Sequence, residues 1–245
     1  MRNWLCMVMV LVLCVLWGRG AFAVELAVTA GIGPGYPVGD FGKTVGIVGA
    51  DQSGTYSATG GGAESNFGFQ LGLEAQVNPR VFVGGMFGYR RYNVQADDVL
   101  NEVIKPLLPE AVRLDANWRN ILFGAYVRAD AYSTQTWRAY SRAGLGVASM
   151  KNSFDVDFGT SDITTRTATT DFDVGNRLYI AGCIGTEYAL ASYVNLFLEL
   201  DFHQFFTDGA EASASIDEYT IRERQKFNTQ ILGVMFGVKI PFNAL

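Results

Sequence analysis

The chain contains a single histidine, His203, and its spacing from Asp201 is the first feature that could support chemistry. Side chains two residues apart on a strand point to the same face. A histidine held by a carboxylate can activate a serine nucleophile. The same row continues with Phe205 and Thr207, so no serine follows. We therefore expect no enzymatic activity, and nothing in the sequence calls for a cofactor.

The composition excludes other classes of protein. Of 245 residues, 24 are acidic and 19 basic, and only 18% are charged whereas 49% are hydrophobic. No basic run is available to neutralise phosphates, which argues against a nucleic-acid partner. The 17 Phe, 11 Tyr and 4 Trp provide too much aromatic surface for a disordered chain. One histidine and the cysteine Cys183, on different predicted strands, give no metal-ligand spacing, so we expect no metal site.

The first 23 residues have the pattern of a cleaved signal peptide. Arg2 supplies a positive start, and the residues from Leu5 to Trp17 form an apolar run. This run is shorter than the ~20 residues of a membrane-spanning helix. Ala21 and Ala23 place small residues before a cut at Val24. The sequence therefore predicts an exported protein whose mature chain covers residues 24–245.

The mature chain alternates apolar and other residues with a period of two, which is the pattern of half-buried strands. From Phe67 to Val77 every odd residue is apolar, and every even residue is polar or glycine. From Val194 to Phe202 the even residues are all apolar. Extended along the chain, the pattern predicts eight strands at about 24–33, 66–77, 81–93, 117–131, 137–150, 175–190, 193–206 and 227–242.

Short and long connections alternate between these strands. The turns at 78–80, 133–136 and 191–192 are tight, and the segments near 34–65, 94–116, 151–174 and 207–226 are long. Outer-membrane barrels have short periplasmic turns, long extracellular loops and tilted strands of about 9–11 residues. We predict an all-β fold, an eight-stranded antiparallel transmembrane up-and-down barrel, with four long extracellular loops and both termini in the periplasm.

A soluble sandwich or lipocalin also alternates, but its apolar face turns inward. Here charges of both signs lie in the middle of strands, on the face opposite the apolar one, which favours a barrel with lipid outside. The residues expected to face lipid include Leu71, Leu73, Val127, Leu196, Leu198, Val234 and Phe236.

Eight strands enclose a lumen just wide enough for side chains, so its contents decide whether it is open. The inward charges are Glu74, Arg128, Arg142, Glu187, Glu199, Asp201 and Lys239. Counting from the short turns places most of them at similar depth, where opposite charges should pair. They are either a salt-bridge core that shuts the lower half or a gate that rearranges. Many inward glycines leave space, either for packing of neighbouring tyrosine rings or for a cavity.

The second long connection holds the one helical pattern, over 97–111, interrupted by Pro106. Its apolar face needs a partner. It could cap the barrel mouth, line an entrance for apolar ligands, lie in the outer leaflet, or pack on the other loops.

At the level of pattern the whole mature chain resembles the small eight-stranded outer-membrane proteins, the OmpW, OmpA-type and opacity barrels. The similarity rests on the export signal, the run Gly35 to Phe41 after the first strand, the three tight turns, and a last strand that alternates up to Phe242. It implies outer-membrane lipid and the barrel-assembly machinery as partners, with Phe242 as the assembly signal. Members usually stop on an aromatic residue, whereas here three residues follow, so either Phe242 serves or Leu245 replaces it.

Two functions are compatible with this sequence. The resemblance to OmpW-like barrels implies a porin or channel for passive uptake of small apolar molecules, through a mouth lined by residues 97–111 with Tyr89, Tyr92, Trp118 and Phe206. The alternative is a structural or adhesive barrel without transport, whose loops contact extracellular or host ligands.

Overall fold

The computed structural model describes residues 25–43, 47–50, 55–94, 97, 100, 101, 105, 111–158, 166–216 and 219–243. The predicted signal peptide and its cleavage site at Ala21, Ala23 and Val24 lie outside these residues. Most of the predicted helix at 97–111 lies outside them as well.

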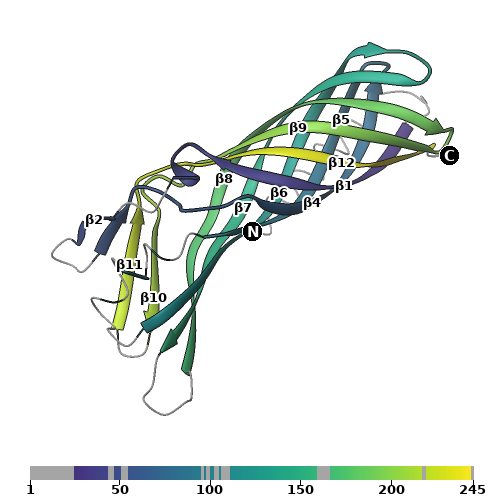
Figure 1. Ribbon diagram of the computed structural model, residues 1–245. Coiled ribbons are helices and arrows are strands. Elements are labelled where there is room, and N and C mark those ends of the chain that lie inside the picture. The colour runs from purple at the N-terminus through teal and green to yellow at the C-terminus, as the bar shows by residue number, and fades with distance from the viewer. Residues whose placement is uncertain are drawn as a thin grey trace.

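Eight antiparallel strands close into a barrel, as the sequence predicts (Figure 1). They are β1 (Glu25–Val38), β4 (Asn66–Asn78), β5 (Val81–Asn93), β6 (Ala111–Ser133), β7 (Trp137–Phe158), β8 (Arg166–Ala191), β9 (Val194–Phe205) and β12 (Thr229–Asn243). Each pairs with its neighbour in this order, and β12 closes the barrel on β1. Glu25 pairs with Asn243, so the first and last strands begin and end at the rim that carries the tight turns.

An apolar belt covers the outside of the barrel. Leu71, Leu198 and Phe236 expose about half of their side-chain surface, at 47%, 49% and 54%. Leu73 and Val127 are equally exposed, and Leu196 and Val234 are partly exposed. A contiguous apolar surface of this extent is not stable in water, and it matches the lipid-facing band of a transmembrane barrel. Within the described residues, no helix is long and apolar enough to cross a membrane.

Three strands run well past this belt. β6, β7 and β8 contain 23, 22 and 26 residues, against 12 to 15 in the other five. In Figure 1 they project together beyond the barrel end that is remote from the tight turns. The segments 111–116, 151–158 and 166–174, which the sequence reading assigned to loops, are therefore strand. A membrane-spanning strand needs only about 9–11 residues, so the remainder lies outside the bilayer.

The alternation inverts where these strands leave the belt. On β6, Ile121 and Phe123 face outward with the lipid-facing residues, whereas Arg113 and Arg119 are the outward residues beyond them. Over the same stretch the inward positions become apolar, with Trp118 only 2% exposed. The extension is thus a sheet with a polar outside and an apolar inside, the arrangement expected in water.

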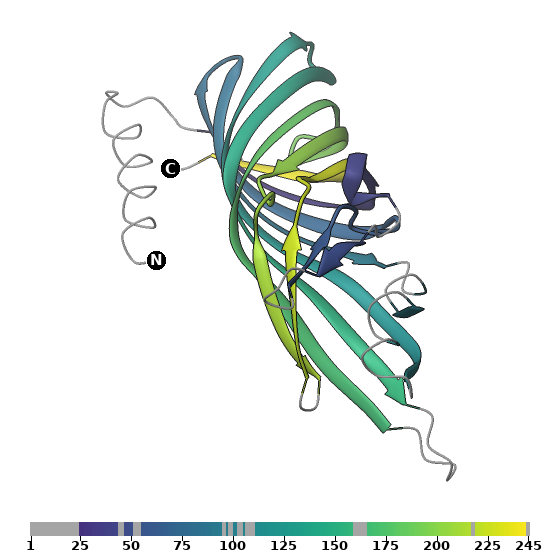
Figure 2. The same ribbon diagram turned by 90° about the vertical axis from the view of Figure 1, so that its left-hand side faces the viewer.

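A second sheet lies beside this extension (Figure 2). Its strands are ordered β10 (Glu211–Ile216), β11 (Tyr219–Gln225), β3 (Thr55–Ala58) and β2 (Ile47–Ala50), so the first and last long connections pair with each other. A short 3-10 turn, η1 (Gly39–Phe41), precedes β2 and buries Phe41 completely.

Candidate functional site in the barrel interior

The lower interior holds a cluster of charges that pair with one another. Arg128 Nη1 lies 2.7 Å from Glu187 Oε2 and 3.4 Å from Glu74 Oε2, and Arg128 Nε lies 3.0 Å from Asp130 Oδ1. Lys239 Nζ lies 2.7 Å from Glu74 and 3.6 Å from Glu187. These five side chains are at most 3% exposed. Every charge of the cluster therefore has a partner of opposite sign, which buried ions require.

A second charged pair lies next to this cluster. Arg142 Nη2 is 2.8 Å from Glu199 Oε2, and the Tyr140 hydroxyl donates to Glu199 Oε1 at 2.8 Å. Tyr140 also lies under the Arg128 guanidinium, 3.8 Å from the ring centroid. The Tyr126 ring similarly faces Arg142 while its hydroxyl donates to Glu74. The two tyrosines therefore link the pair to the cluster.

Asp201 belongs to a third group, further from the tight turns. Its carboxylate forms an ion pair with Arg90 and a 2.7 Å hydrogen bond with His203 Nε2, and all three residues are buried. The seven charges expected in the lumen are thus all buried, and they form three groups. Arg90 and Asp130 complete the pairing and were not among the residues singled out from the sequence. The alternation could have identified them. Even residues face inward on both strands, as Gly84 does on β5 and Arg128 on β6.

Inward glycines receive the aromatic rings. A Cβ at Gly185 would lie 2.6 Å from Tyr140 Cζ, and one at Gly84 would lie 2.5 Å from Tyr126 Cζ. Tyr179 lies in the same way against Gly124 and Gly146. Contacts this short mean that the ring would have to shift to admit a side chain at these positions. Of the two possibilities raised by the sequence, packing of rings is therefore the one found at these glycines.

A small void lies at mid-barrel and a larger hollow lies at the rim. A void of about 10 Å³ lies among Met86, Arg142, Cys183, Asp201 and His203. A hollow of about 340 Å³ lies at the rim of the tight turns, lined by residues that include Arg138, Glu187, Asn195 and Phe242. The first has room for about one water molecule. Cys183 is buried and unbridged, as a small packing residue would be.

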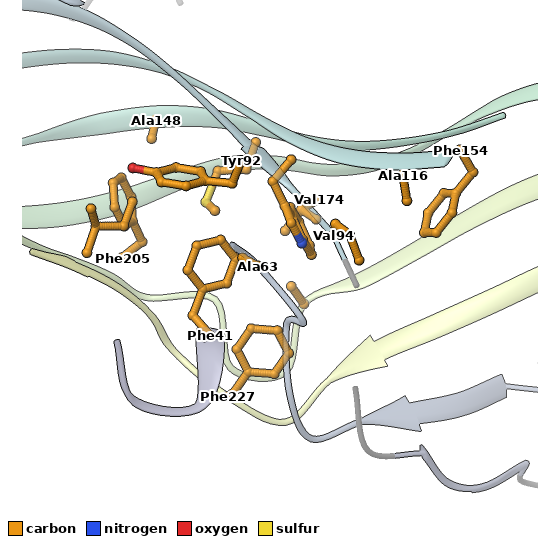
Figure 3. Packing of buried hydrophobic residues seen from close by; sticks show 14 of the residues in the cluster. Phe41, Ala63, Tyr92, Val94, Ala116, Ala148, Phe154, Val174, Phe205 and Phe227 are labelled. Carbon is orange, nitrogen blue, oxygen red and sulfur yellow. The ribbon is translucent and has the colours of Figure 1, made fainter. Parts of the chain in front are cut away.

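The outer part of the interior is mostly apolar. Its buried cluster includes Phe41, Tyr92, Trp118, Leu122, Met150, Phe154, Tyr179, Phe205, Phe227 and Ile231. In Figure 3, Phe41 projects from the first long connection into this cluster, with Tyr92 and Phe227 near its ring. The ring centroids of Tyr92 and Trp118 are each 5.7 Å from that of Phe41. Trp118 Nε1 donates to the Gly61 carbonyl at 3.1 Å, which fixes the connection over the barrel end.

The predicted mouth lining is only half right. Tyr92 and Trp118 are buried inside, but Phe206 is 49% exposed on the outside and Tyr89 stacks on the outward Phe69. Tyr89 occupies an outward position on β5, and Phe206 continues the outward row of β9 just past the end of that strand. The assignment of aromatics to a mouth overlooked this alternation. Leu100, from the segment 97–111, is buried in the apolar cluster. Phe41 is completely buried in the same cluster, but it lies on a 3-10 turn of three residues, where no alternation could mark it as an inward residue.

Phe242 lies on the outside of the last strand. It is 42% exposed and pairs with Leu26 across the seam between β12 and β1. An accessible aromatic on the closing strand is compatible with the assembly role expected for it.

Comparison with known proteins places the fold among outer-membrane barrels. A major outer membrane protein from Thermus thermophilus is 14% identical and superposes with a TM-score of 0.52, over 90% of this chain and all of that one. The chain has the fold of a small outer-membrane β-barrel. The outer membrane protein AlkL, studied in lipid bilayers, gives 13% identity, a TM-score of 0.46 and coverage of 92% and 94%. The outer membrane protease OmpT of Escherichia coli is 10% identical, with a TM-score of 0.45, over 90% of this chain and 97% of that one. No protein-family model and no curated protein matches the sequence.

Proposed function

We propose that this protein is a non-enzymatic outer-membrane barrel, closed to water inside, that presents a rigid platform of strands at the cell surface for contact with extracellular ligands. The continuation of β6, β7 and β8 past the lipid-facing belt supports this function. Ordering each extra residue costs roughly 1–2 kcal/mol of backbone entropy, and the apolar core beneath the extension offsets that cost. A wall that only crosses the bilayer does not need such an extension.

The outward surface of the platform carries charges of both signs. Arg119 Nη2 lies 3.2 Å from Asp171, and Lys151 Nζ lies 3.5 Å from Asp173. Arg113 pairs with Asp115 at 2.9 Å. Exposed pairs contribute only about 0–1 kcal/mol, so they can exchange partners with little loss. A polar ligand of mixed charge, such as the surface of another protein, fits this chemistry.

We propose in addition a route to the membrane and an orientation within it. The chain is exported by its signal peptide and inserted by the barrel-assembly machinery through its last strand. The rim of tight turns and both termini face the periplasm, and the platform faces outward. Labelling of intact cells tests this orientation.

Attachment measurements test the platform. In one variant, Lys151 is joined to Asp173 through a two-residue turn, which removes most of the β7–β8 extension. In a second, Arg119 and Asp171 are both replaced by Ala, which removes surface charges and leaves the strands. Bacteria displaying each form are applied to monolayers of cultured mammalian cells. We expect bacteria that display the wild-type barrel to attach. Bacteria with the shortened form should lose attachment, and those with the double variant should bind more weakly. Equal attachment of all three and of cells without the barrel would refute a binding function.

A second candidate is passive uptake of small apolar molecules, which the resemblance to OmpW-like barrels implies. The apolar outer interior favours it, as does an interruption in the seam between β1 and β12. Ile32 pairs with Phe236 and Gly35 pairs with Gly233, but the two residues of β1 between them have no partner on β12. Between them, Pro34 has no N–H to donate to the ladder. An apolar solute stopped by the charges below would leave sideways into lipid there, and dye uptake by liposomes separates this function from the first.

A further inference from the structure

Asn120 is an unusual residue of the outer interior. It lies on β6 with no exposed surface, and neither its Nδ2 nor its Oδ1 has a hydrogen-bond partner among the described residues. A buried amide without partners is strongly unfavourable, since it loses its hydrogen bonds to water and gains none. A packing position would be filled better by Leu, which has a similar size.

The surroundings of Asn120 combine apolar walls with further polar groups. Asn120 pairs with Arg90 on β5 and Met150 on β7. Trp118 and Leu122 are its neighbours on the inward row of β6, and both are buried. Arg90 and the hydroxyl of Tyr92, the next inward residue of β5, lie close enough to interact with each other, but neither Arg90 Nη1 nor this hydroxyl has a hydrogen bond of good geometry within the described part of the chain. Mostly apolar walls with a few convergent polar groups are the composition of small-molecule sites.

Phe41 occupies the apolar part of this region. Its ring is fully buried between Tyr92 and Trp118, although Asp40 and Lys43 on either side of the turn are exposed. It reaches the interior from a 3-10 turn of three residues. The ring therefore takes the place that a small aromatic or apolar group would occupy.

The polar groups restrict the chemistry of that molecule. Asn120 offers one donor and one acceptor group, and the Tyr92 hydroxyl can do either. The charge of Arg90 is already neutralised by Asp201, so a second carboxylate would be repelled and a cation would gain nothing. A neutral group that both donates and accepts, such as a carboxamide, is the complement.

We propose that the outer interior is a binding site for small neutral aromatic or apolar amides, in which Asn120 binds the polar group and the ring of the ligand replaces that of Phe41. This site goes beyond the surface platform and does not depend on it. Asn120 is then retained for binding although it lowers the stability of the unliganded barrel.

Trp118 provides the readout. Replacing Trp137, at the opposite rim, by Phe leaves Trp118 as the single tryptophan of the predicted mature chain, and this form in lipid vesicles is titrated with benzamide. Toluene, which lacks the amide, is the matched control probe. We expect saturable quenching or a spectral shift with benzamide and tighter binding after Phe41→Ala. Asn120→Leu should weaken benzamide binding about tenfold and leave toluene binding within about twofold.

Stability measurements distinguish a binding residue from a structural one. Asn120→Leu should raise the urea concentration at the midpoint of unfolding, because it removes an unpartnered amide. A lowered midpoint would overturn the proposal, since it would make Asn120 structural. Absence of saturable benzamide binding in both the wild type and Phe41→Ala would overturn it as well. The same holds if benzamide and toluene respond equally to Asn120→Leu.

Discussion

Arg142 Nη2 lies 2.8 Å from Glu199 Oε2, and both side chains are withdrawn from water in the middle of the barrel. The two residues come from β7 and β9, which are separated by β8. The pair therefore spans the inside of the barrel wall, and its loss should be felt by three strands.

Replacing one partner should cost more than replacing an exposed ion. Arg142→Ala leaves the Glu199 carboxylate buried and unpaired, and we expect a loss of about 3–5 kcal/mol in the free energy of unfolding. Urea unfolding in lipid vesicles, followed by tryptophan fluorescence, measures it. Arg113→Ala, at a side chain 67% exposed, is the control and should cost at most about 1 kcal/mol. Similar losses in the two variants would mean that the interior is hydrated.

Neighbouring residues on one strand differ in whether they tolerate a charge, because one faces lipid and the next faces the barrel interior. Leu198 is 49% exposed and Glu199 is 4% exposed on the same strand. Leu198→Arg should cost about 2–4 kcal/mol if the side chain lies near the bilayer midplane. Glu199→Gln should still insert, because the amide fits the same place. Quantitative folding into vesicles tests both, and unimpaired insertion of Leu198→Arg would exclude a lipid-facing position.

Much of this architecture could be predicted from the sequence. With lipid outside the barrel and polar residues inside, the strands alternate with a period of two, and the apolar face is the outward one. The strand ends could not be predicted, because the same alternation continues on β6 past Arg119 with its polarity inverted. A prediction that follows one continuous apolar face ends the strand where the polarity inverts. Pairing partners such as Arg90 and Asp201 depend on the stagger of strands distant in sequence, which no local pattern encodes.

Gly185 tests the packing of rings in the interior. The three atoms nearest to a Cβ there all belong to Tyr140, the nearest at 2.6 Å. We expect Gly185→Ala to cost about 1–3 kcal/mol. The loss should be smaller in a Tyr140→Leu background, which a double-mutant cycle measures. Gly182→Ala, whose Cβ would have nothing closer than 4.0 Å, is the control and should be nearly neutral. An equal loss in both backgrounds would show that the ring does not fill the glycine position.

Epitope tags test the orientation. A tag inserted after Asp208, in the connection between β9 and β10, should bind antibody on intact cells because it lies at the platform end. A tag at Asn78–Arg80 or at Ala191–Ser192 should bind only after the outer membrane is opened. The reverse pattern would invert the topology.

Our central proposal is that the described charges and rings close the barrel, so that the protein binds at its surface and does not conduct. A planar-bilayer recording of the purified wild-type protein, paired with uptake of an apolar dye by liposomes, tests it most directly. We predict no steady conductance and no dye uptake above that of protein-free liposomes. Steady conductance of the wild type, or dye uptake above that of protein-free liposomes, would contradict closure and would establish the barrel as a passage.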